Sequence, residues 1–321
     1  MAHPFIRVPA SVLKLAIVVP CYNEQEVLPQ TVSRLDELVR ELIAAGQIAE
    51  GSLYFVDDGS DDATWALIEN FAAENSCVHG MKLSRNYGHQ RALLAGLLTV
   101  PGDVVVSIDA DLQDDPAAIK DMIAAYIAGA EIVYGVRRER KVDTPFKRVT
   151  AEAYYSALRT IGVQLIFNHA DYRLLSRTVI ETLRTYKETN IFLRGLIPQL
   201  GFQAALVYYD RQERLAGVSK YPISKMLALA IEGVTSFSDV PLRIITWLGL
   251  VISIFSFGMG IWALCIRIFD PSAVPGWAST VIPLYMLGGV QLLSMGVIGQ
   301  YLAKIYAETK ARPRFIIERE L

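Results

Sequence analysis

The sequence contains little of what builds a disulfide scaffold or a zinc site. Its three cysteines, Cys21, Cys77 and Cys265, lie far apart, and its four histidines show no HExxH or HxxxH spacing. We therefore expect three buried thiols in a reducing compartment, no CxxC metal pair and no zinc centre. The formal net charge is only −2, so no basic field indicates nucleic acid as a partner.

The commonest nucleotide-binding signatures are also missing. The chain has no GxxxxGK[ST] loop, and no GxGxxG follows the first apolar strand, which disfavours an NAD enzyme. The N-terminal segment MAHPFIRVPASVLKLAIVVP has a short apolar run that contains Lys14 and no small-residue cleavage site. We therefore expect no signal peptide, and we expect the bulk of the protein to stay in the compartment where it is made.

Two long stretches near the C-terminus lack charged residues. One run, from Ile244 to Ile266, spans 23 residues, and a second extends from Pro271 to Ala303. A helix of about 20 apolar residues crosses a bilayer, and a buried core helix rarely runs so long without a charge. We therefore predict two transmembrane helices, at about 244–268 and 277–300.

Cationic residues flank this pair of runs. The loop between the runs holds only Arg267 and Asp270, so the positive-inside rule places both outer ends in the cytoplasm. Residues 223–237 are apolar with occasional charges, which is typical of an amphipathic helix at the membrane interface. The alternative is an ordinary helix packed on a sheet. The flanking cations are Arg243 before the pair and Lys304, Lys310, Arg312 and Arg314 after it.

The rest of the chain alternates short apolar runs with helical patterns. Predicted strands are residues 15–20, 53–56, 78–83, 104–108 and 131–136, and predicted helices include one that ends near residue 45 and one over 90–98. This βαβα order predicts an α/β domain with a mostly parallel sheet. Ligands of such sheets bind beyond the carboxyl ends of the strands, and the polar clusters of this sequence fall there.

The clearest chemical signal is Asp109-Ala110-Asp111-Leu112-Gln113, directly after the fourth predicted strand. In an extended chain, side chains two apart share a face, so Asp109, Asp111 and Gln113 are expected to point the same way. Adjacent carboxylates repel unless a cation lies between them. Mg²⁺ or Mn²⁺ prefers oxygen ligands and keeps positions for diphosphate oxygens. We predict a metal site that offsets charge on a departing nucleoside diphosphate; the alternative is a solvated loop.

A second acidic pair, Asp57-Asp58, ends the second predicted strand. A carboxylate there accepts hydrogen bonds from a base N–H group or from ribose hydroxyls, and the alternative is that the pair only shapes a turn. Ser60 is predicted to cap the following helix, with Asp61 and Asp62 in its first turn.

Several segments together resemble a known family. LAIVVPCYNE, VDDGSDD, RNYGHQRALLAGL and IDADLQDDP, in this order and spacing, resemble family 2 glycosyltransferases of the GT-A fold. DYRLLSR, NIFLRG, RLAGVSKY and the two apolar runs ending in TKARPRF are similar to polyprenyl-phosphate glycosyltransferases. Bacterial undecaprenyl-phosphate glucosyltransferases of O-antigen modification are the most similar, and dolichol-phosphate mannose synthases are more distant relatives.

The resemblance implies roles for individual positions. Asp171 matches an acidic family residue near the sugar, described as a base or an orienting group, and Arg214 and Lys220 join it as catalytic residues. A phosphate acceptor is already anionic and needs no base, so Asp171 alternatively orients a sugar hydroxyl or an arginine such as Arg173. The implied metal ligands are Asp109, Asp111 and Gln113. The implied substrate-binding residues are Pro20, Tyr22, Glu24, Asp57, Asp109, Arg137, Arg211 and Ser219.

Two anionic substrates that meet in one site require cations. Arginine forks match phosphate oxygens, and the alternative for each candidate is a solvated surface charge. The candidates are Arg137, Arg138, Arg211, Arg214 and Lys220.

The expected reaction is transfer of a hexose to undecaprenyl or another polyprenyl phosphate, with inversion at the anomeric carbon. UDP-glucose is the preferred donor, and GDP-mannose, UDP-N-acetylglucosamine or a modified pentose are alternatives. A processive polysaccharide synthase is disfavoured, because the sequence has no Arg-Trp pair and only two candidate spans. The alternative of another class is a non-catalytic membrane scaffold or flippase with a nucleotide-sugar-binding fold.

The resemblance and the hydropathy pattern together predict the organisation of the chain. Residues 1–218 form a cytoplasmic GT-A catalytic domain, 219–240 a juxtamembrane amphipathic helix, 241–303 the two spans and 304–321 a cytoplasmic tail. The expected partners are a nucleotide sugar, a polyprenyl phosphate and the cell (inner) membrane, but no nucleic acid. Gln291 and the glycines Gly288, Gly289 and Gly296 suit helix packing within or between chains, so a homo-oligomer is a further expectation.

Overall fold

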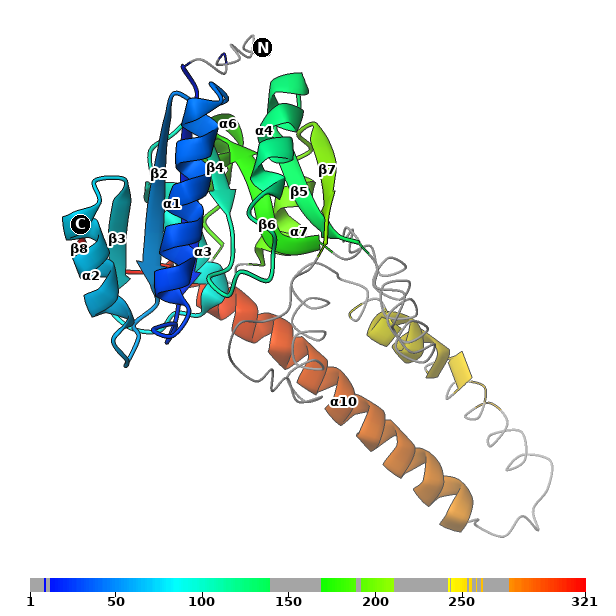
Figure 1. Ribbon diagram of the computed structural model, residues 1–321. Coiled ribbons are helices and arrows are strands. Elements are labelled where there is room, and N and C mark those ends of the chain that lie inside the picture. The colour runs from blue at the N-terminus through cyan, green and yellow to red at the C-terminus, as the bar shows by residue number, and fades with distance from the viewer. Residues whose placement is uncertain are drawn as a thin grey trace, which may run out of the picture. The chain divides into compact units, whose positions relative to one another are not determined.

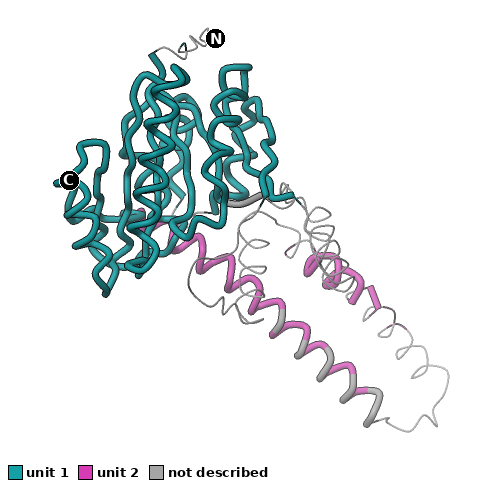
Figure 2. The backbone as a smooth tube through the Cα atoms, in the orientation of Figure 1, with its two compact units in different colours: residues 1–156, 164–221, 312–321 teal, residues 157–163, 222–311 magenta. Residues whose placement is uncertain are grey.

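The computed structural model describes residue 9, residues 12–138, 169–188 and 192–210, scattered helical residues between 242 and 261, and residues 277–321. The chain divides into two compact units (Figure 2). Unit 1 consists of residues 1–156, 164–221 and 312–321, and unit 2 of residues 157–163 and 222–311.

Unit 1 is built on one eight-stranded sheet, with strand order β7-β5-β6-β4-β1-β2-β3-β8 (Figure 1). Neighbouring strands β1–β2, β1–β4, β2–β3 and β5–β7 are parallel, whereas β6 and β8 run antiparallel to their neighbours. The predicted mostly parallel α/β sheet is therefore confirmed. The strands are β1 (Lys14–Cys21), β2 (Glu50–Asp57), β3 (Val78–Leu83), β4 (Val104–Ser107), β5 (Ile132–Arg137), β6 (His169–Ser176), β7 (Ala204–Tyr209) and β8 (Ile317–Glu320).

Helices cover both faces of this sheet, which explains why the central strands are apolar throughout. On one face, Ile17 and Phe55 belong to a cluster with residues of α1 (Leu28–Ala44), α2 (Thr64–Glu74) and α4 (Ala118–Ala128). On the other face, Val18 and Val56 belong to a cluster with residues of α3 (His89–Thr99), α6 (Arg177–Thr185) and α7 (Leu193–Gln199). Each fully buried aliphatic side chain contributes roughly 1.5–3 kcal/mol.

Strand β6 brings a distant segment to the middle of the sheet. It lies between β4 and β5, and Arg173 of β6 is in register with Ser107 of β4 and Tyr134 of β5. Because β6 is antiparallel to both neighbours, its first residues lie at the edge where β4 and β5 end. Asp171, near the start of β6, is thereby carried to the carboxyl edge of the parallel strands.

The C-terminal segment completes the other end of the sheet. Strand β8 pairs antiparallel with β3, the Leu321 N–H donates to the Gly80 carbonyl at 2.9 Å, and the Ser84 N–H donates to the Ile316 carbonyl at 3.0 Å. The exposed pair Arg319–Glu69, at 2.7 Å, links the strand to α2. This strand lies in the predicted tail, where the sequence pattern indicated no strand.

The turn after β2 differs from the prediction for Ser60. Helix α2 begins only at Thr64, and Ala63 is its N-cap residue. The Ser60 hydroxyl instead accepts a hydrogen bond from the Asn23 N–H at 3.0 Å. The predicted cap was wrong because a neighbouring turn, distant in sequence, supplies a donor for this hydroxyl.

Gly59 is fixed by both its backbone angle and its surroundings, which leads to a stability prediction. Its φ is +69°, and a Cβ atom there would lie 2.5 Å from the Arg85 carbonyl carbon and 2.7 Å from the Asn86 nitrogen. We expect Gly59→Ala to lower the free energy of unfolding by about 2–4 kcal/mol, through left-handed strain plus overpacking. Chemical denaturation in detergent measures it. The matched control is Gly46→Ala, at φ +68° with nothing within 4 Å, which should show the strain alone; equal effects would contradict the clash.

In unit 2, helix α10 (Trp277–Thr309) is 33 residues long and covers the second predicted span. Much of the first predicted span, 244–268, and all of 219–240 lie outside the described residues. Among the helices described, none combines the length and apolar character that crossing a membrane requires.

Candidate active site

Two turns at the carboxyl ends of β1 and β2 are joined by hydrogen bonds. Asn23 has a left-handed φ of 55°, and its side-chain oxygen accepts from the Asp61 N–H at 2.9 Å. The Glu24 N–H donates to the Thr64 hydroxyl at 2.9 Å. Asparagine adopts left-handed angles more readily than most residues, which suits it to this turn. The two hydrogen bonds fix the position of the loop that follows β2 against the Tyr-Asn-Glu turn.

The four predicted nucleotide-binding residues of this region differ in accessibility. Pro20 is buried at the end of β1, Tyr22 is 44% exposed, and Glu24 borders an open cavity of about 400 Å³. Asp57 is completely buried, and burial raises the pKa of its carboxyl group. One Asp57 oxygen accepts from the Ser60 N–H at 3.2 Å, and the other has no partner among the described residues. A ligand reaches Asp57 only if its neighbours move, so its role stays a prediction.

Asp58 has a role that the sequence analysis did not assign. Its two carboxylate oxygens accept from the Tyr87 N–H at 2.7 Å and the Gly88 N–H at 2.9 Å. Gly88 is the N-cap residue of α3 and has a φ of 91°. Asp58 therefore holds the start of α3 at the carboxyl edge of the sheet, where His89 and Gln90 follow.

The segment after β4 is a bent loop rather than the extended chain that was predicted. Leu112 has a φ of 50°, and the Gln113 N–H donates to the Asp111 carboxylate at 3.2 Å. Asp109 and Asp111 are partly exposed, whereas Gln113 is 6% exposed. The simple alternation of faces was wrong because the chain turns between Asp111 and Gln113. In the part of the chain that is described, no group of three His, Cys, Asp or Glu side chains is placed to hold a metal ion.

Arg137 is engaged by a buried acid. Its Nε and Nη2 atoms lie 3.0 and 2.9 Å from one oxygen of Asp114, which also accepts from the Tyr209 hydroxyl at 2.5 Å. Burial lowers the pKa of Arg137, and the Asp114 charge more than offsets this, so the pKa is raised. Arg138 pairs at the surface with Asp210 at 3.3 Å. These ion pairs hold the ends of β5 and β7 to the loop after β4.

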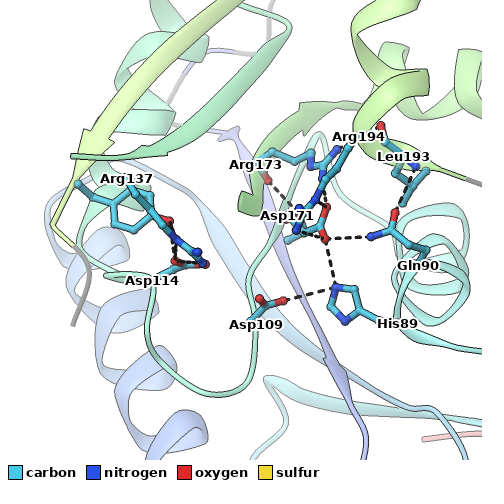
Figure 3. Close-up of polar contacts among 11 residues, drawn as sticks. His89, Gln90, Asp109, Asp114, Arg137, Asp171, Arg173, Leu193 and Arg194 are labelled. Atoms are coloured by element: carbon cyan, nitrogen blue, oxygen red, sulfur yellow. Dashed lines mark hydrogen bonds and ion pairs between the residues drawn. The ribbon is translucent and has the colours of Figure 1, made fainter. Parts of the chain in front are cut away.

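Asp171 is the centre of a polar network that includes His89, Gln90, Arg173 and Arg194 (Figure 3). The Arg194 guanidinium binds it with both an Nε contact of 3.1 Å and an Nη2 contact of 3.0 Å. Arg173 and Gln90 also donate to it, Gln90 at 2.9 Å. Burial alone would raise the pKa of Asp171, but the His89 hydrogen bond and the two arginines hold it well below its usual range. Asp171 thus contacts Arg173, the arginine that the sequence analysis named as its alternative partner, and its role in the reaction stays a prediction.

His89 connects this network to the predicted metal ligands. Its Nε2 atom lies 3.5 Å from Asp171 and 3.6 Å from Asp109. Burial raises the pKa of Asp109 to about 6, with repulsion from Asp171 and Asp114 adding to it and His89 opposing it. Burial lowers the pKa of His89, but its two acidic neighbours reverse this and raise it. The region around Asp109 is therefore crowded with carboxylates and suits a cation.

Four predicted residues, Arg211, Arg214, Ser219 and Lys220, lie outside the described residues, and their roles stay predictions. The sequence analysis missed three residues of the site: His89, Gln90 and Arg194. His89 and Gln90 lie in RNYGHQR and Arg194 in NIFLRG. Both segments had already contributed to the family resemblance. Their polar side chains could therefore have been named as candidates for the site.

The chain is similar to known proteins in both family and overall sequence. The model of glycosyl transferase family 2 matches residues 16–184. An uncharacterised glycosyltransferase of Bacillus subtilis, YkoT, is 49% identical over 310 residues, which are 96% of this chain and 92% of that protein. A bactoprenol glucosyl transferase of Shigella phage SfX is 39% identical over 310 residues, which are 95% and 99% of the two chains.

Solved structures match more distantly. Glucosyl-3-phosphoglycerate synthase from Mycobacterium tuberculosis, in complex with Mn²⁺, UDP and phosphoglyceric acid, is 18% identical, with a TM-score of 0.47 and coverage of 70% of this chain and 76% of that one. The family match includes β1 to β6 with the acidic segments after β2 and β4 and Asp171. The chain is therefore a glycosyltransferase with the predicted GT-A fold and a member of glycosyl transferase family 2.

Proposed function

We propose that this enzyme transfers glucose from UDP-glucose to a polyprenyl phosphate at the cell membrane. The observation that carries the proposal is the extent of the similarity to bactoprenol glucosyl transferase, which spans 95% of this chain. It includes the apolar C-terminal part as well as the sheet. A shared catalytic domain alone would leave the acceptor open, whereas shared long apolar segments favour a lipid acceptor.

The proposed reaction is one displacement at the anomeric carbon. An oxygen of the acceptor phosphate forms the new bond to this carbon, the bond to the diphosphate oxygen breaks, and its electron pair leaves with UDP. Attack from the opposite side inverts the configuration. The acceptor phosphate is anionic at neutral pH, so no proton has to be removed from it. The principal task of the protein is to bring two anions together, which electrostatic stabilisation and positioning accomplish.

The residues after β4 fit a Mg²⁺ or Mn²⁺ ion. Mg²⁺ is commonly bound by one or two carboxylates plus substrate phosphate oxygens rather than by an all-protein cage. Asp109 and Asp111 supply two partly exposed carboxylates; burial first, and repulsion from neighbouring carboxylates second, raise the pKa of Asp109. A bound divalent ion would neutralise charge on the leaving diphosphate. Gln113 is buried, and we propose it as a further ligand only after the loop rearranges.

A multi-pass membrane location with cytoplasmic termini is also proposed. The chain leaves unit 1 after residue 221 and returns to it at residue 312, so any membrane crossing between these points occurs an even number of times. Large apolar side chains of α10 are exposed, including Leu292 at 73% and Met295 at 69%, and contiguous apolar exposure marks interaction surfaces. We propose spans at 244–268 and 277–300, an interfacial helix at 219–240, and helix packing through Gly288 and Gly296 in a homo-oligomer.

The reaction is tested with purified protein in detergent, undecaprenyl phosphate, Mg²⁺ or Mn²⁺, and radiolabelled nucleotide sugars. We expect label from UDP-glucose to enter the organic phase, and EDTA to stop it. A panel that includes GDP-mannose and UDP-N-acetylglucosamine identifies the donor. Absence of transfer from every donor, with lipid and metal verified, would argue for the non-catalytic alternative.

Metal binding is expected to release a proton at mildly acidic pH. The pKa of Asp109 is raised to about 6 from an ordinary value near 4. Protonated Asp109 therefore stabilises the folded protein below about pH 4, and this contribution is lost as the pH rises through about 6. A metal needs the ionised carboxylate, so metal binding below about pH 6 must displace the proton of Asp109. Calorimetry of Mn²⁺ binding in two buffers of different ionisation enthalpy should show most of a proton released at pH 5.5 and almost none at pH 7.5. Equal release at both pH values would contradict Asp109 as a ligand.

A further inference from the structure

The hydrogen-bonding capacity of Asp171 is fully used by protein donors. One oxygen accepts from Arg173 and from Arg194 Nε at 3.1 Å, and the other from Gln90 at 2.9 Å and Arg194 Nη2 at 3.0 Å. The His89 Nε2 atom is an additional neighbour, 3.5 Å from the second oxygen. The Asp171 side chain is 4% exposed. A carboxylate surrounded in this way is a poor proton acceptor, so its function must lie in the groups that it holds.

The two arginines held by Asp171 differ in one respect. Arg173 is completely buried, and its Nη1 atom contacts the Leu193 carbonyl at 3.5 Å. The Arg194 side chain is 43% exposed. A guanidinium has five N–H donors in a planar fork, and Asp171 engages only the Nε–Nη2 edge of Arg194. Among the described residues, the Nη1 end of Arg194 has no hydrogen-bond partner.

The position of Arg194 is fixed from two sides. The Gln90 side chain donates to Asp171 and at the same time accepts from the Leu193 N–H at 3.2 Å. Leu193 begins α7 and directly precedes Arg194. Gln90 therefore ties the backbone before Arg194 to the same carboxylate that holds its guanidinium. A cation held in this way loses little side-chain entropy when it binds a ligand.

The same cluster includes the predicted metal ligand Asp109. His89 lies within 3.6 Å of both Asp109 and Asp171, and Figure 3 shows Arg194 and Asp109 on opposite sides of this histidine–aspartate contact. The partly exposed Arg194 side chain thus belongs to the same polar cluster as Asp109, where a metal-bound diphosphate would meet an acceptor.

We propose that Arg194 is a phosphate-binding residue of the transfer site and that Asp171 is its positioning residue rather than a general base. The identity of the phosphates rests on the proposed function. The shared chemistry is a phosphate oxyanion, which belongs either to the acceptor lipid or to the donor diphosphate.

Binding measurements on the full chain in detergent separate these two sources. Calorimetry with UDP and Mn²⁺ reports the donor diphosphate, and calorimetry with farnesyl phosphate reports the acceptor phosphate. We expect Arg194→Ala to weaken one of the two about 10- to 100-fold, as the loss of charge-assisted hydrogen bonds does. Guanidinium ions at millimolar concentration should partly restore the affected binding, and NaCl of equal ionic strength should not.

The matched control is Arg40→Ala, which removes another aspartate-paired arginine, 74% exposed on α1 and 2.7 Å from Asp36. If Arg194→Ala does not fold, Arg194→Gln, which keeps a donor for Asp171, replaces it. Binding of both ligands within twofold of wild type in the folded variant would overturn the proposal, as would a wild-type protein that binds neither ligand. Wild-type binding without sugar transfer would overturn the proposed function alone, because the comparison of variants still decides the role of Arg194.

Discussion

Replacing Asp111 by asparagine is expected to lower the turnover number of sugar transfer by about 10²- to 10⁴-fold. A divalent cation contributes several kcal/mol of charge stabilisation to such a reaction, and each 1.36 kcal/mol is a factor of ten in rate. Asparagine keeps an oxygen for the Gln113 N–H, which lies 3.2 Å from Asp111, so the loop should keep its shape. The measurement is transfer of radiolabelled glucose to undecaprenyl phosphate at saturating Mn²⁺.

The control for this experiment is Asp121→Asn, the same chemical change in the first turn of α4. Asp121 is exposed and outside the site, so activity should stay within twofold of wild type. Thermal denaturation of both variants should match wild type. A fully active Asp111→Asn enzyme would exclude Asp111 as a metal ligand.

Replacing Asp171 by alanine is expected to lower the free energy of unfolding by about 3–5 kcal/mol. The substitution leaves the completely buried Arg173 without its anionic partner, and an uncompensated buried charge is among the most destabilising changes in a protein. Because the folded pKa of Asp171 is depressed, the stabilisation is present above its ordinary pKa near 4 and is lost as the pH falls below it. Chemical denaturation at pH 7 measures the difference.

Two further variants test the cause of this loss. The double substitution Asp171→Leu with Arg173→Met removes both charges and should recover most of the stability, since apolar replacements of buried ion pairs are often neutral. Glu41→Ala breaks an exposed ion pair with Lys120, at 2.7 Å, and should leave the free energy of unfolding almost unchanged, because solvent screens such pairs. If Asp171→Ala and Glu41→Ala had similar effects, the buried charge would not be the reason.

The parts of the fold predicted from sequence are those with a local signal. The five strands β1 to β5 are short apolar runs separated by helical patterns, and each appears close to its predicted range. Strands β6 and β8 contain polar residues, such as Asp171 and Arg319. Each of the two pairs with a strand that is distant in the sequence, β6 with β4 and β8 with β3. Their strand conformation depends on these long-range pairings, which no local pattern encodes.

The site follows the same rule. Asp109 and Asp111 lie two positions apart and directly follow a buried strand, so their place at the carboxyl edge of the sheet was predictable, and metal binding there stays a prediction. The network around Asp171 joins Gln90 from α3, Asp171 from β6 and Arg194 from α7. Three elements must be folded before these polar groups meet, so sequence spacing gave no distance between them. The hypothesis that Asp171 orients an arginine came from the chemistry of the acceptor instead. A phosphate acceptor is already anionic and needs no base, which leaves Asp171 an orienting role.

The pairing of β8 with β3 has a consequence for the synthesis of the protein. Strand β3 ends at Leu83 and β8 begins at Ile317, so every residue between them is translated before the pair can form. At roughly 5–20 residues per second this takes on the order of 10 to 50 seconds. During that interval β3 presents unpaired N–H and C=O groups along one edge, and such an edge is a template for pairing with another chain. Until β8 has been translated, the nascent protein is therefore exposed to edge-to-edge pairing with another chain through β3.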